Sequence, residues 1–263
     1  MTPTQVKSYI TSIFLTLIMA AGAFAQLDEA YEAHGGLQAF RNMGVVEYDT
    51  EMELGGGALK ISDHQLIDLD SRKVLVTSGG YKIGFDGSEA WILPGMSAFP
   101  IPPRFYAMTP FYFFGLPFLF ADPGVNLEPL GTKELGGEQF DAVKVTYDAG
   151  VGDTPDDNYV IYMDKDTRRI KLVHYIVTYP PLMDAETVDE LERHAAVYDE
   201  WQEVNGMLVP KKITFYEWAE DSLNTEPVGY LNFEHVSFSE QNPDPALFSR
   251  PEGAEVDNSH TAR

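Results

Sequence analysis

Residues 104–120 read RFYAMTPFYFFGLPFLF, and eight of these seventeen positions are aromatic. The rings belong to Phe105, Tyr106, Phe111, Tyr112, Phe113, Phe114, Phe118 and Phe120. Because each ring can bury roughly 150 to 250 Å², the stretch carries on the order of 1,000 Å² of apolar surface. That area exceeds the few hundred Å² that a soluble monomer usually exposes in one patch. The rest of the fold, or a partner, must therefore cover this aromatic stretch.

Three alternatives could bury the aromatic stretch. It could pack in the protein's own core, form a lid over a lipid-like ligand, or insert into a membrane surface. A transmembrane helix is the weakest interpretation, because a span takes about 20 apolar residues. Pro110, Gly115 and Pro117 also interrupt the run. The core and the ligand-facing lid remain the two main alternatives.

Short strand signals separated by turn residues occupy most of the remaining chain, which indicates a meandering antiparallel sheet. In Val46–Leu54, apolar or small residues alternate with acidic ones, as expected of a strand with one wet face. Asn205-Gly206 predicts a two-residue hairpin, because both residues tolerate positive φ. We expect about eleven strands, drawn from residues 46–54, 59–69, 73–78, 81–85, 90–93, 127–135, 140–147, 159–163, 170–179, 196–204, 207–218 and 230–238.

Two helical segments are expected beside the sheet. Leu27–Met43 carries apolar residues at helical spacing on either side of Gly35-Gly36, which predicts a helix, a kink and a second short helix. Asp184 is a candidate cap for a helix to about Arg193. A sheet of this length must bury one of its faces against other parts of the protein. The expected fold class is mainly β (α+β): a curved antiparallel half-barrel with few helices and an aromatic lid over its concave face.

The amino terminus resembles a secretory signal. Lys7 precedes an apolar run over residues 10–21, and Ala23-Phe24-Ala25 fits a small-residue cleavage site. We therefore expect residues 1–25 to be a cleaved signal peptide and residues 26–263 to form a single periplasmic domain. An uncleaved membrane anchor is the alternative. The chain contains no cysteine, which excludes disulfides and lipid modification at cysteine.

The formal charge of −23 becomes −24 when residues 1–25 are removed, because they include Lys7 and no acidic residue. So much negative charge repels nucleic-acid backbones, so we expect no nucleic-acid partner. The densest acidic cluster, Asp153, Asp156 and Asp157, is interpreted as a solvated turn because the spacing of an EF-hand loop is missing. We expect a monomer without a cofactor.

The usual catalytic motifs are missing from the sequence: a Walker A loop, G-x-G-x-x-G, H-E-x-x-H and G-x-S-x-G. His34-Gly35-Gly36 resembles the oxyanion loop of esterases, but without a nucleophile elbow a helix kink is the better interpretation. No histidine pair has the i, i+4 spacing of a helical metal site, although His174 and His235 could meet across the sheet. No catalytic or metal-binding residue is assigned, and we expect a protein that is not an enzyme.

Six segments together resemble uncharacterised secreted bacterial proteins related to LolA and LolB: HGGLQAFRNMGVVEY (34–48), FDGSEAWIL (85–93), FLFADPGVNLEPLG (118–131), YVIYMDKDTRRIKLVHY (159–175), WQEVNGMLVP (201–210) and DPALFSRPEGAEV (244–256). The resemblance covers nearly the whole mature chain. It implies a half-barrel plugged by helices, whose apolar cavity receives lipoprotein acyl chains in the characterised relatives. The strong acidity and the aromatic stretch distinguish this chain from those carriers.

The leading functional hypothesis is a periplasmic carrier of an amphipathic, acyl-chain-bearing ligand in an apolar cavity. The alternative is an envelope interaction module that docks through the aromatic stretch, and a hydrolase is a third possibility. Arg104 is the candidate polar anchor, for a backbone carbonyl or for a ligand head group, unless it is a solvated surface residue. Trp91, Trp201 and Trp218 are most simply core residues. The candidate ligand-binding residues are Arg104, Phe105, Phe111, Phe113, Phe114, Phe118 and Trp91.

Overall fold

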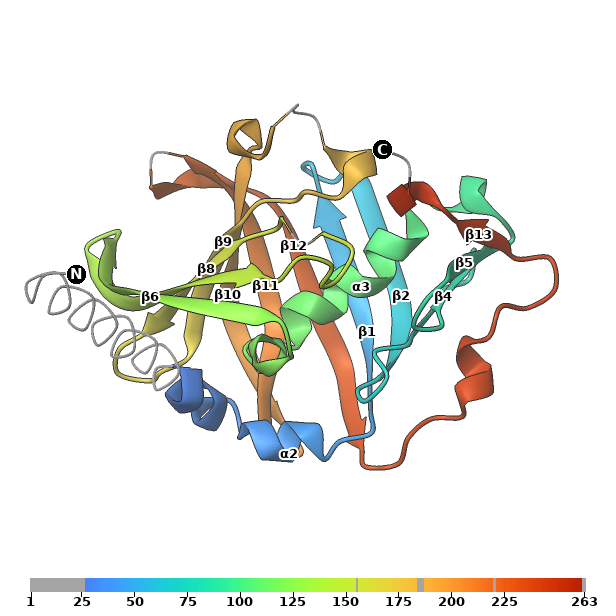
Figure 1. The fold of residues 1–263 in the computed structure, drawn as a ribbon, viewed down its shortest axis with the longest axis horizontal. Coiled ribbons are helices and arrows are strands. Elements are labelled where there is room, and N and C mark those ends of the chain that lie inside the picture. Colours follow the sequence, from blue (N-terminus) through green and yellow to red (C-terminus); the bar gives the residue numbers. More distant parts are fainter. Residues whose placement is uncertain (1–26, 155, 184–186, 220, 262–263) are drawn as a thin grey trace, which may run out of the picture.

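The computed structural model describes residues 27–154, 156–183, 187–219 and 221–261. These residues contain one antiparallel sheet of thirteen strands, in the order β13-β5-β4-β3-β2-β1-β12-β11-β10-β9-β8-β7-β6. The sheet is strongly curved, and helix α3 lies across its concave side (Figure 1). The predicted curved antiparallel fold with few helices is confirmed, with thirteen strands in place of about eleven. The expected signal peptide, residues 1–25, lies outside the described residues.

The strands are β1 (Val45–Leu54), β2 (Leu59–Asp68), β3 (Val74–Thr77), β4 (Lys82–Phe85), β5 (Ala90–Leu93), β6 (Val125–Leu135), β7 (Glu138–Tyr147), β8 (Tyr159–Asp164), β9 (Ile170–Tyr175), β10 (Arg193–Val204), β11 (Met207–Ala219), β12 (Ser222–Ser239) and β13 (Glu255–Asp257). The α-helices are residues 27–33, α2 (Leu37–Arg41) and α3 (Pro103–Phe114). Short 3-10 helices are η1 (Met96–Ala98), η2 (Phe118–Ala121), η3 (Pro180–Leu182), η4 (Val188–Glu190), η5 (Pro245–Phe248) and η6 (Ser259–Thr261).

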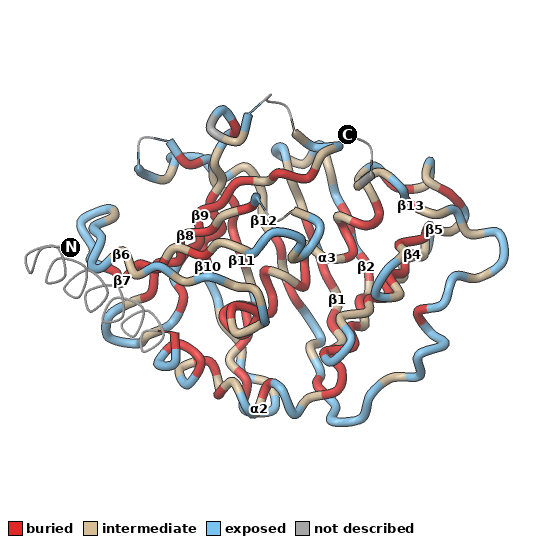
Figure 2. Tube along the Cα trace, viewed as in Figure 1, coloured by how far each residue is buried: buried red, intermediate tan, exposed pale blue. Residues whose placement is uncertain are grey.

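Strand β1 separates the two faces of the sheet as its sequence predicts. Val46, Tyr48, Thr50 and Met52 are buried on the concave face, whereas the acidic residues between them point to the other side. Because side chains alternate across a strand, the same division runs through the sheet. Figure 2 shows buried segments in α3 and in strands on both sides of it, among them β4, β5, β8 and β9.

The amino-terminal helices close one end of the half-barrel. Gly35 and Gly36 have φ of 110° and 95°, which ends the first helix and confirms the predicted kink. A Cβ on Gly35 would lie 2.4 Å from the carbonyl oxygen of Gly206, so only glycine fits there. The amide of Leu208 donates to the carbonyl of His34 at 3.0 Å. The helix break is therefore held against the β10–β11 hairpin.

That hairpin has the predicted geometry. Asn205 and Gly206 have φ of 53° and 78°, and Val204 pairs directly with Met207. The connection is thus a two-residue turn with two positive φ angles, which is compatible with the right-handed twist of the flanking strands.

Other boundaries differ from the sequence predictions. The predicted helix from Asp184 to Arg193 is wrong: Asp184 lies outside the described residues, η4 is a single turn, and β10 already begins at Arg193. Pairing of His194 with Tyr175 on β9 outweighs the weak local helical pattern. Strand β12 begins at Ser222, and the three-residue strand β13 is too short for periodicity to reveal.

Two small apolar clusters lie outside the main core. One contains Leu75, Trp91 and Phe248, with the Trp91 indole donating to the carbonyl of Phe248 at 2.9 Å. The other includes Trp218, whose ring stacks on His174 with centroids 4.4 Å apart. Trp91 and Trp218 are therefore core residues of these clusters. No helix among the described residues is long and apolar enough to cross a membrane.

Candidate ligand-binding cavity

Helix α3 presents two different faces. On the sheet side, the ring of Phe114 lies 4.7 Å from that of Tyr48 and 5.1 Å from that of Phe233, measured between centroids. Ala107 on the same side is also buried. This half of the aromatic stretch is core, as one of the two main alternatives predicted.

A buried carboxylate fixes α3 to the sheet. Oδ2 of Asp63 accepts hydrogen bonds from the hydroxyls of Tyr106 and Tyr81, both at 2.7 Å. Oδ1 accepts from Thr50 at 2.7 Å and from Gln65 at 3.0 Å. Four neutral donors thus surround one acidic group on the concave face, which satisfies its hydrogen-bonding capacity. This network was not predicted from the sequence, because Asp63 and Gln65 occupy core positions of β2 that polar residues rarely take.

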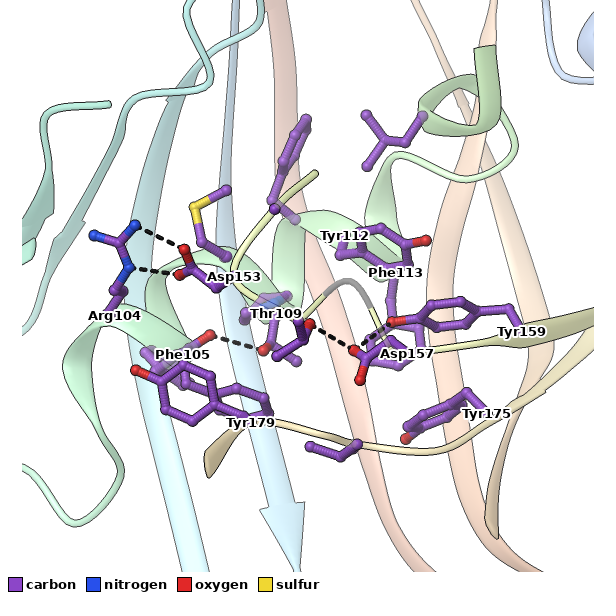
Figure 3. A pocket seen from close by; sticks show the side chains of 18 of the residues that line it. Arg104, Phe105, Thr109, Tyr112, Phe113, Asp153, Asp157, Tyr159, Tyr175 and Tyr179 are labelled. Atoms are coloured by element: carbon purple, nitrogen blue, oxygen red, sulfur yellow. Dashed lines mark hydrogen bonds and ion pairs between the residues drawn. The ribbon is translucent and has the colours of Figure 1, made fainter. Parts of the chain in front are cut away.

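The other side of α3 lines a cavity of about 750 Å³. Phe105, Thr109 and Tyr112 lie at positions i, i+4 and i+7 of the helix, so they share one face, and all three line the cavity. Figure 3 shows them opposite Tyr159, Tyr175 and Tyr179. The aromatic stretch is therefore both core and cavity wall.

Tyrosines dominate the polar groups inside the cavity. Tyr159 on β8 and Tyr175 on β9 are direct pairing partners, and their rings stack with centroids 5.9 Å apart. The hydroxyls of Tyr112 and Tyr147 are hydrogen-bonded to each other. Burial raises the pKa of each of these four hydroxyls above its ordinary value of 10. They are therefore neutral hydrogen-bonding groups at physiological pH.

Asp157 places a carboxylate in the same wall. It is only 9% exposed, and it accepts hydrogen bonds from the amide and hydroxyl of Thr178, both at 2.7 Å, and from the Thr154 hydroxyl at 2.8 Å. The Tyr159 hydroxyl donates a longer bond of 3.4 Å. Burial raises the pKa of Asp157, although these hydrogen bonds oppose the shift.

Arg104 stands at the amino-terminal end of α3 and is only 8% exposed. Its Nε and Nη2 atoms donate to the two carboxylate oxygens of Asp153 at 2.5 and 2.8 Å, and Nη1 donates to the carbonyl of Ser88 at 2.6 Å. The guanidinium also lies 4.9 Å from the centre of the Phe85 ring. The expectation of a backbone-carbonyl anchor is confirmed, and the interpretation as a solvated surface arginine is wrong.

The candidate ligand-binding residues fall into two groups. Arg104, Phe105, Phe111 and Phe113 line the cavity. Phe114 and Phe118 instead pack in the core, where Phe118 stacks on Phe40 with centroids 4.4 Å apart. Trp91 faces away from the cavity, because it follows Ala90 and precedes Ile92, both of which belong to the main core.

Sequence reasoning missed much of the cavity wall. Asp153, Asp156 and Asp157 were interpreted as a solvated turn. Asp153 and Asp156 are exposed, as expected of such a turn, but Asp153 pairs with Arg104 and Asp157 is buried. Tyr159 and Tyr175 were recognised as strand residues only. Their alternation with Val160 and His174 could have assigned them to the concave face, but it could not show that this part of the face is unfilled.

His174 and His235 do not share a site. His174 stacks on Trp218, whereas the Nδ1 atom of His235 lies 2.8 Å from Asp49, so the predicted possibility that the two meet is wrong. Strands β10 and β11 separate their strands in the sheet. In the part of the chain that the structure describes, no group of three or more acidic or histidine side chains is arranged to hold a metal ion.

Comparison with known proteins identifies the fold. No protein-family model matches the chain, and no curated protein matches it in sequence. The LolA superfamily protein NE2245 from Nitrosomonas europaea is similar in structure, with a TM-score of 0.53, 13% identity, and coverage of 87% of this chain and 97% of that one. A DUF1329 family protein from Desulfovibrio piger has a TM-score of 0.52, 11% identity and the same coverage. The chain therefore shares its fold with these LolA superfamily and DUF1329 family proteins, as the resemblance of its six sequence segments implied.

Proposed function

We propose that this protein is a periplasmic carrier that holds an amphipathic, acyl-chain-bearing ligand in the cavity beside α3. The observation that carries the proposal is the cavity itself, with a volume of about 750 Å³ and a wall made largely of aromatic and aliphatic side chains. Small-molecule sites typically enclose roughly 300 to 1,000 Å³ and are lined mainly by such residues.

The energetics favour an acyl chain as the occupant. Each methylene group moved from water into apolar surroundings contributes about 0.8 kcal/mol. The wall is also held in place, since Phe113 packs against Tyr175 and Phe215 with centroids 5.2 and 5.5 Å apart. A wall that is already ordered loses little conformational entropy when a ligand binds.

The buried state of the aromatic stretch supports a carrier over an interaction module. Every residue from Arg104 to Phe120 is buried or half-buried, so the stretch is not a free loop that could dock on a partner. The proposed carrier is not an enzyme; its sequence contains none of the usual catalytic motifs.

A cavity-filling substitution tests the proposal. Thr109→Trp would place a large ring in the cavity, whereas Thr225→Trp makes the same change on an exposed part of β12 that does not line it. Binding is measured by the fluorescence of N-phenyl-1-naphthylamine, a neutral apolar probe. We expect Thr109→Trp to weaken probe binding at least ten-fold and Thr225→Trp to leave it unchanged. Absence of probe binding to the wild type, or equal affinity in all three proteins, contradicts the proposal.

Native mass spectrometry of protein purified from its own host provides a second test. We expect an added mass in the range of an acylated small molecule, together with a chain that begins at Gln26. A chain that retains residues 1–25 and sediments with membranes would contradict the periplasmic assignment, and the carrier proposal would then have to be tested in that setting.

A further inference from the structure

We propose that the cavity selects ligands whose polar group is an uncharged hydrogen-bonding group, such as an alcohol or an ester, and that this group binds at Tyr175 and His194. This inference rests on the proposed carrier function and specifies the class of ligand. It follows from which polar groups of the wall are already satisfied and which are not.

The cationic groups of the wall are occupied. Arg72 and Arg104 are the Arg or Lys residues among the described residues that line the cavity. Asp153 takes two guanidinium donors of Arg104, and both carboxylate oxygens of Asp122 lie 3.1 Å from Nη2 of Arg72. A ligand carboxylate or phosphate would have to break one of these pairs. An anion buried without a cationic partner is strongly unfavourable.

The remaining carboxylate among the described wall residues, Asp157, is also occupied, because it already accepts four hydrogen bonds from Thr154, Thr178 and Tyr159. A cationic head group would therefore find no free carboxylate at this position. The Asp157 carboxylate also disfavours an anionic head group, since like charges in a poorly solvated site repel each other.

Tyr175 is the group that lacks a partner. It is 91% buried, it lines the cavity, and its hydroxyl makes no hydrogen bond to any described residue. Figure 3 shows its ring beside that of Tyr159, both projecting into the cavity. The described residues leave this hydroxyl free to donate, so a ligand oxygen in the cavity can accept a hydrogen bond from it.

His194 provides a second open position next to it. Its ring lies 5.9 Å from the Tyr175 ring, it lines the cavity, and its nitrogens make no hydrogen bond within the described chain. An imidazole ring has two nitrogens that can form hydrogen bonds. Together with the Tyr175 hydroxyl, it matches an alcohol or an ester, which can both be bound without a net charge.

Matched ligands with the same fourteen-carbon chain test the selectivity. Displacement of N-phenyl-1-naphthylamine is measured at pH 8 with 1-tetradecanol, monomyristoylglycerol, myristate and tetradecylammonium. We expect the two neutral ligands to displace the probe at concentrations at least ten-fold lower than the two ions.

Tyr175→Phe removes only the hydroxyl. It should weaken binding of 1-tetradecanol and monomyristoylglycerol about five-fold, relative to the probe affinity measured on the same variant, which corresponds to about 1 kcal/mol for one neutral hydrogen bond. His194→Phe should act in the same direction. The matched control is Tyr162→Phe, because Tyr162 lies in the separate cluster with Trp218 and does not line the cavity.

The outcomes separate the two proposals. If the wild type does not bind the probe, the carrier function fails. If the probe binds but myristate competes as well as 1-tetradecanol, or if Tyr175→Phe binds every ligand like the wild type, the inference about the polar group fails and the carrier function stands.

Discussion

The hydroxyl of Tyr106 on α3 donates a hydrogen bond of 2.7 Å to Oδ2 of Asp63 on β2, in the buried centre of the concave face. Burial is the largest cause that raises the pKa of Tyr106, and the charge of Asp63 adds to it. This bond joins the aromatic helix to the sheet. It sets the position of the helix, and with it the position of the cavity on the far side of α3.

Tyr106→Phe should therefore destabilise the fold. The substitution removes one of two donors to Oδ2 of Asp63, and a hydrogen bond to a charged group contributes about 1.5 to 3 kcal/mol. Chemical denaturation measures the change in the free energy of unfolding. Tyr230→Phe is the control, because Tyr230 donates to Glu53 at 3.1 Å near the surface and should cost clearly less. Equal losses would show that the buried bond has no special role.

The ion pair between Arg104 and Asp153 should be energetically coupled. Arg104→Ala leaves Asp153 and the Ser88 carbonyl without their donors, and we expect a loss of about 2 kcal/mol. In a double-mutant cycle with Asp153→Ala, the two losses should not add. Additive losses would mean that the pair contributes nothing to stability. Arg104→Lys should recover only part of the loss, because a lysine cannot reproduce the two-pronged contact.

Truncating rings on the two sides of α3 should have different effects. Phe114→Ala removes a ring packed between Tyr48 and Phe233, so we expect a loss of about 3 to 5 kcal/mol in the free energy of unfolding. Phe105 is only half-buried and borders the cavity, so Phe105→Ala should cost less stability and weaken probe binding. Melting temperature and probe affinity are measured together. If Phe105→Ala costs as much stability as Phe114→Ala and does not change affinity, Phe105 is a core residue.

The turn at Asn205-Gly206 gives a prediction about backbone strain. Gly206 has φ of 78°, which a β-branched residue adopts only with strain of about 1 to 3 kcal/mol, so Gly206→Val should destabilise the fold by more than about 1 kcal/mol. Gly79→Val is the matched control: Gly79 lies in an exposed turn without positive φ and with open space around its Cβ position. Thermal melting compares the two variants. An unchanged midpoint for Gly206→Val would rule out this turn geometry.

Two buried histidines should make the fold sensitive to acid. Burial lowers the pKa of His34 and of His174 from 6.5 to about 4. Between these pH values the unfolded chain binds a proton at each site that the folded chain does not bind. The contribution of these two histidines to the free energy of unfolding is therefore fully present above pH 6.5, and it is lost progressively as the pH decreases to about 4.

The variant His174→Phe tests this, because phenylalanine keeps a ring against Trp218 but does not titrate. The free energy of unfolding should fall less steeply with decreasing pH in the variant than in the wild type. The carboxyl groups titrate in both proteins, so the difference between the two curves isolates His174. Parallel curves between pH 6.5 and 4 would refute the assignment.

Local patterns were sufficient for much of the fold. The alternation in Val46–Leu54 specified which side chains face inward, and the pair Asn205-Gly206 specified its turn, because both depend on residues close together in the chain. The predicted helix from Asp184 to about Arg193 was wrong, because pairing of residues 194–197 with strand β9 outweighed local propensity.

The aromatic composition of residues 104–120 by itself required a large apolar cover, whatever the topology. Only the tertiary structure decided which rings became core and which became cavity wall. Phe114 and Phe105 have the same side chain in the same helix. Phe114 packs against Tyr48 on the concave face of the sheet, whereas Phe105 borders the cavity. The same holds for Asp153 and Asp157, whose partners Arg104 and Thr178 are distant in sequence. Whether an interior space is filled depends on the curvature of the whole sheet. Whether a buried polar group has a partner depends on contacts between distant segments. No local sequence pattern encodes either.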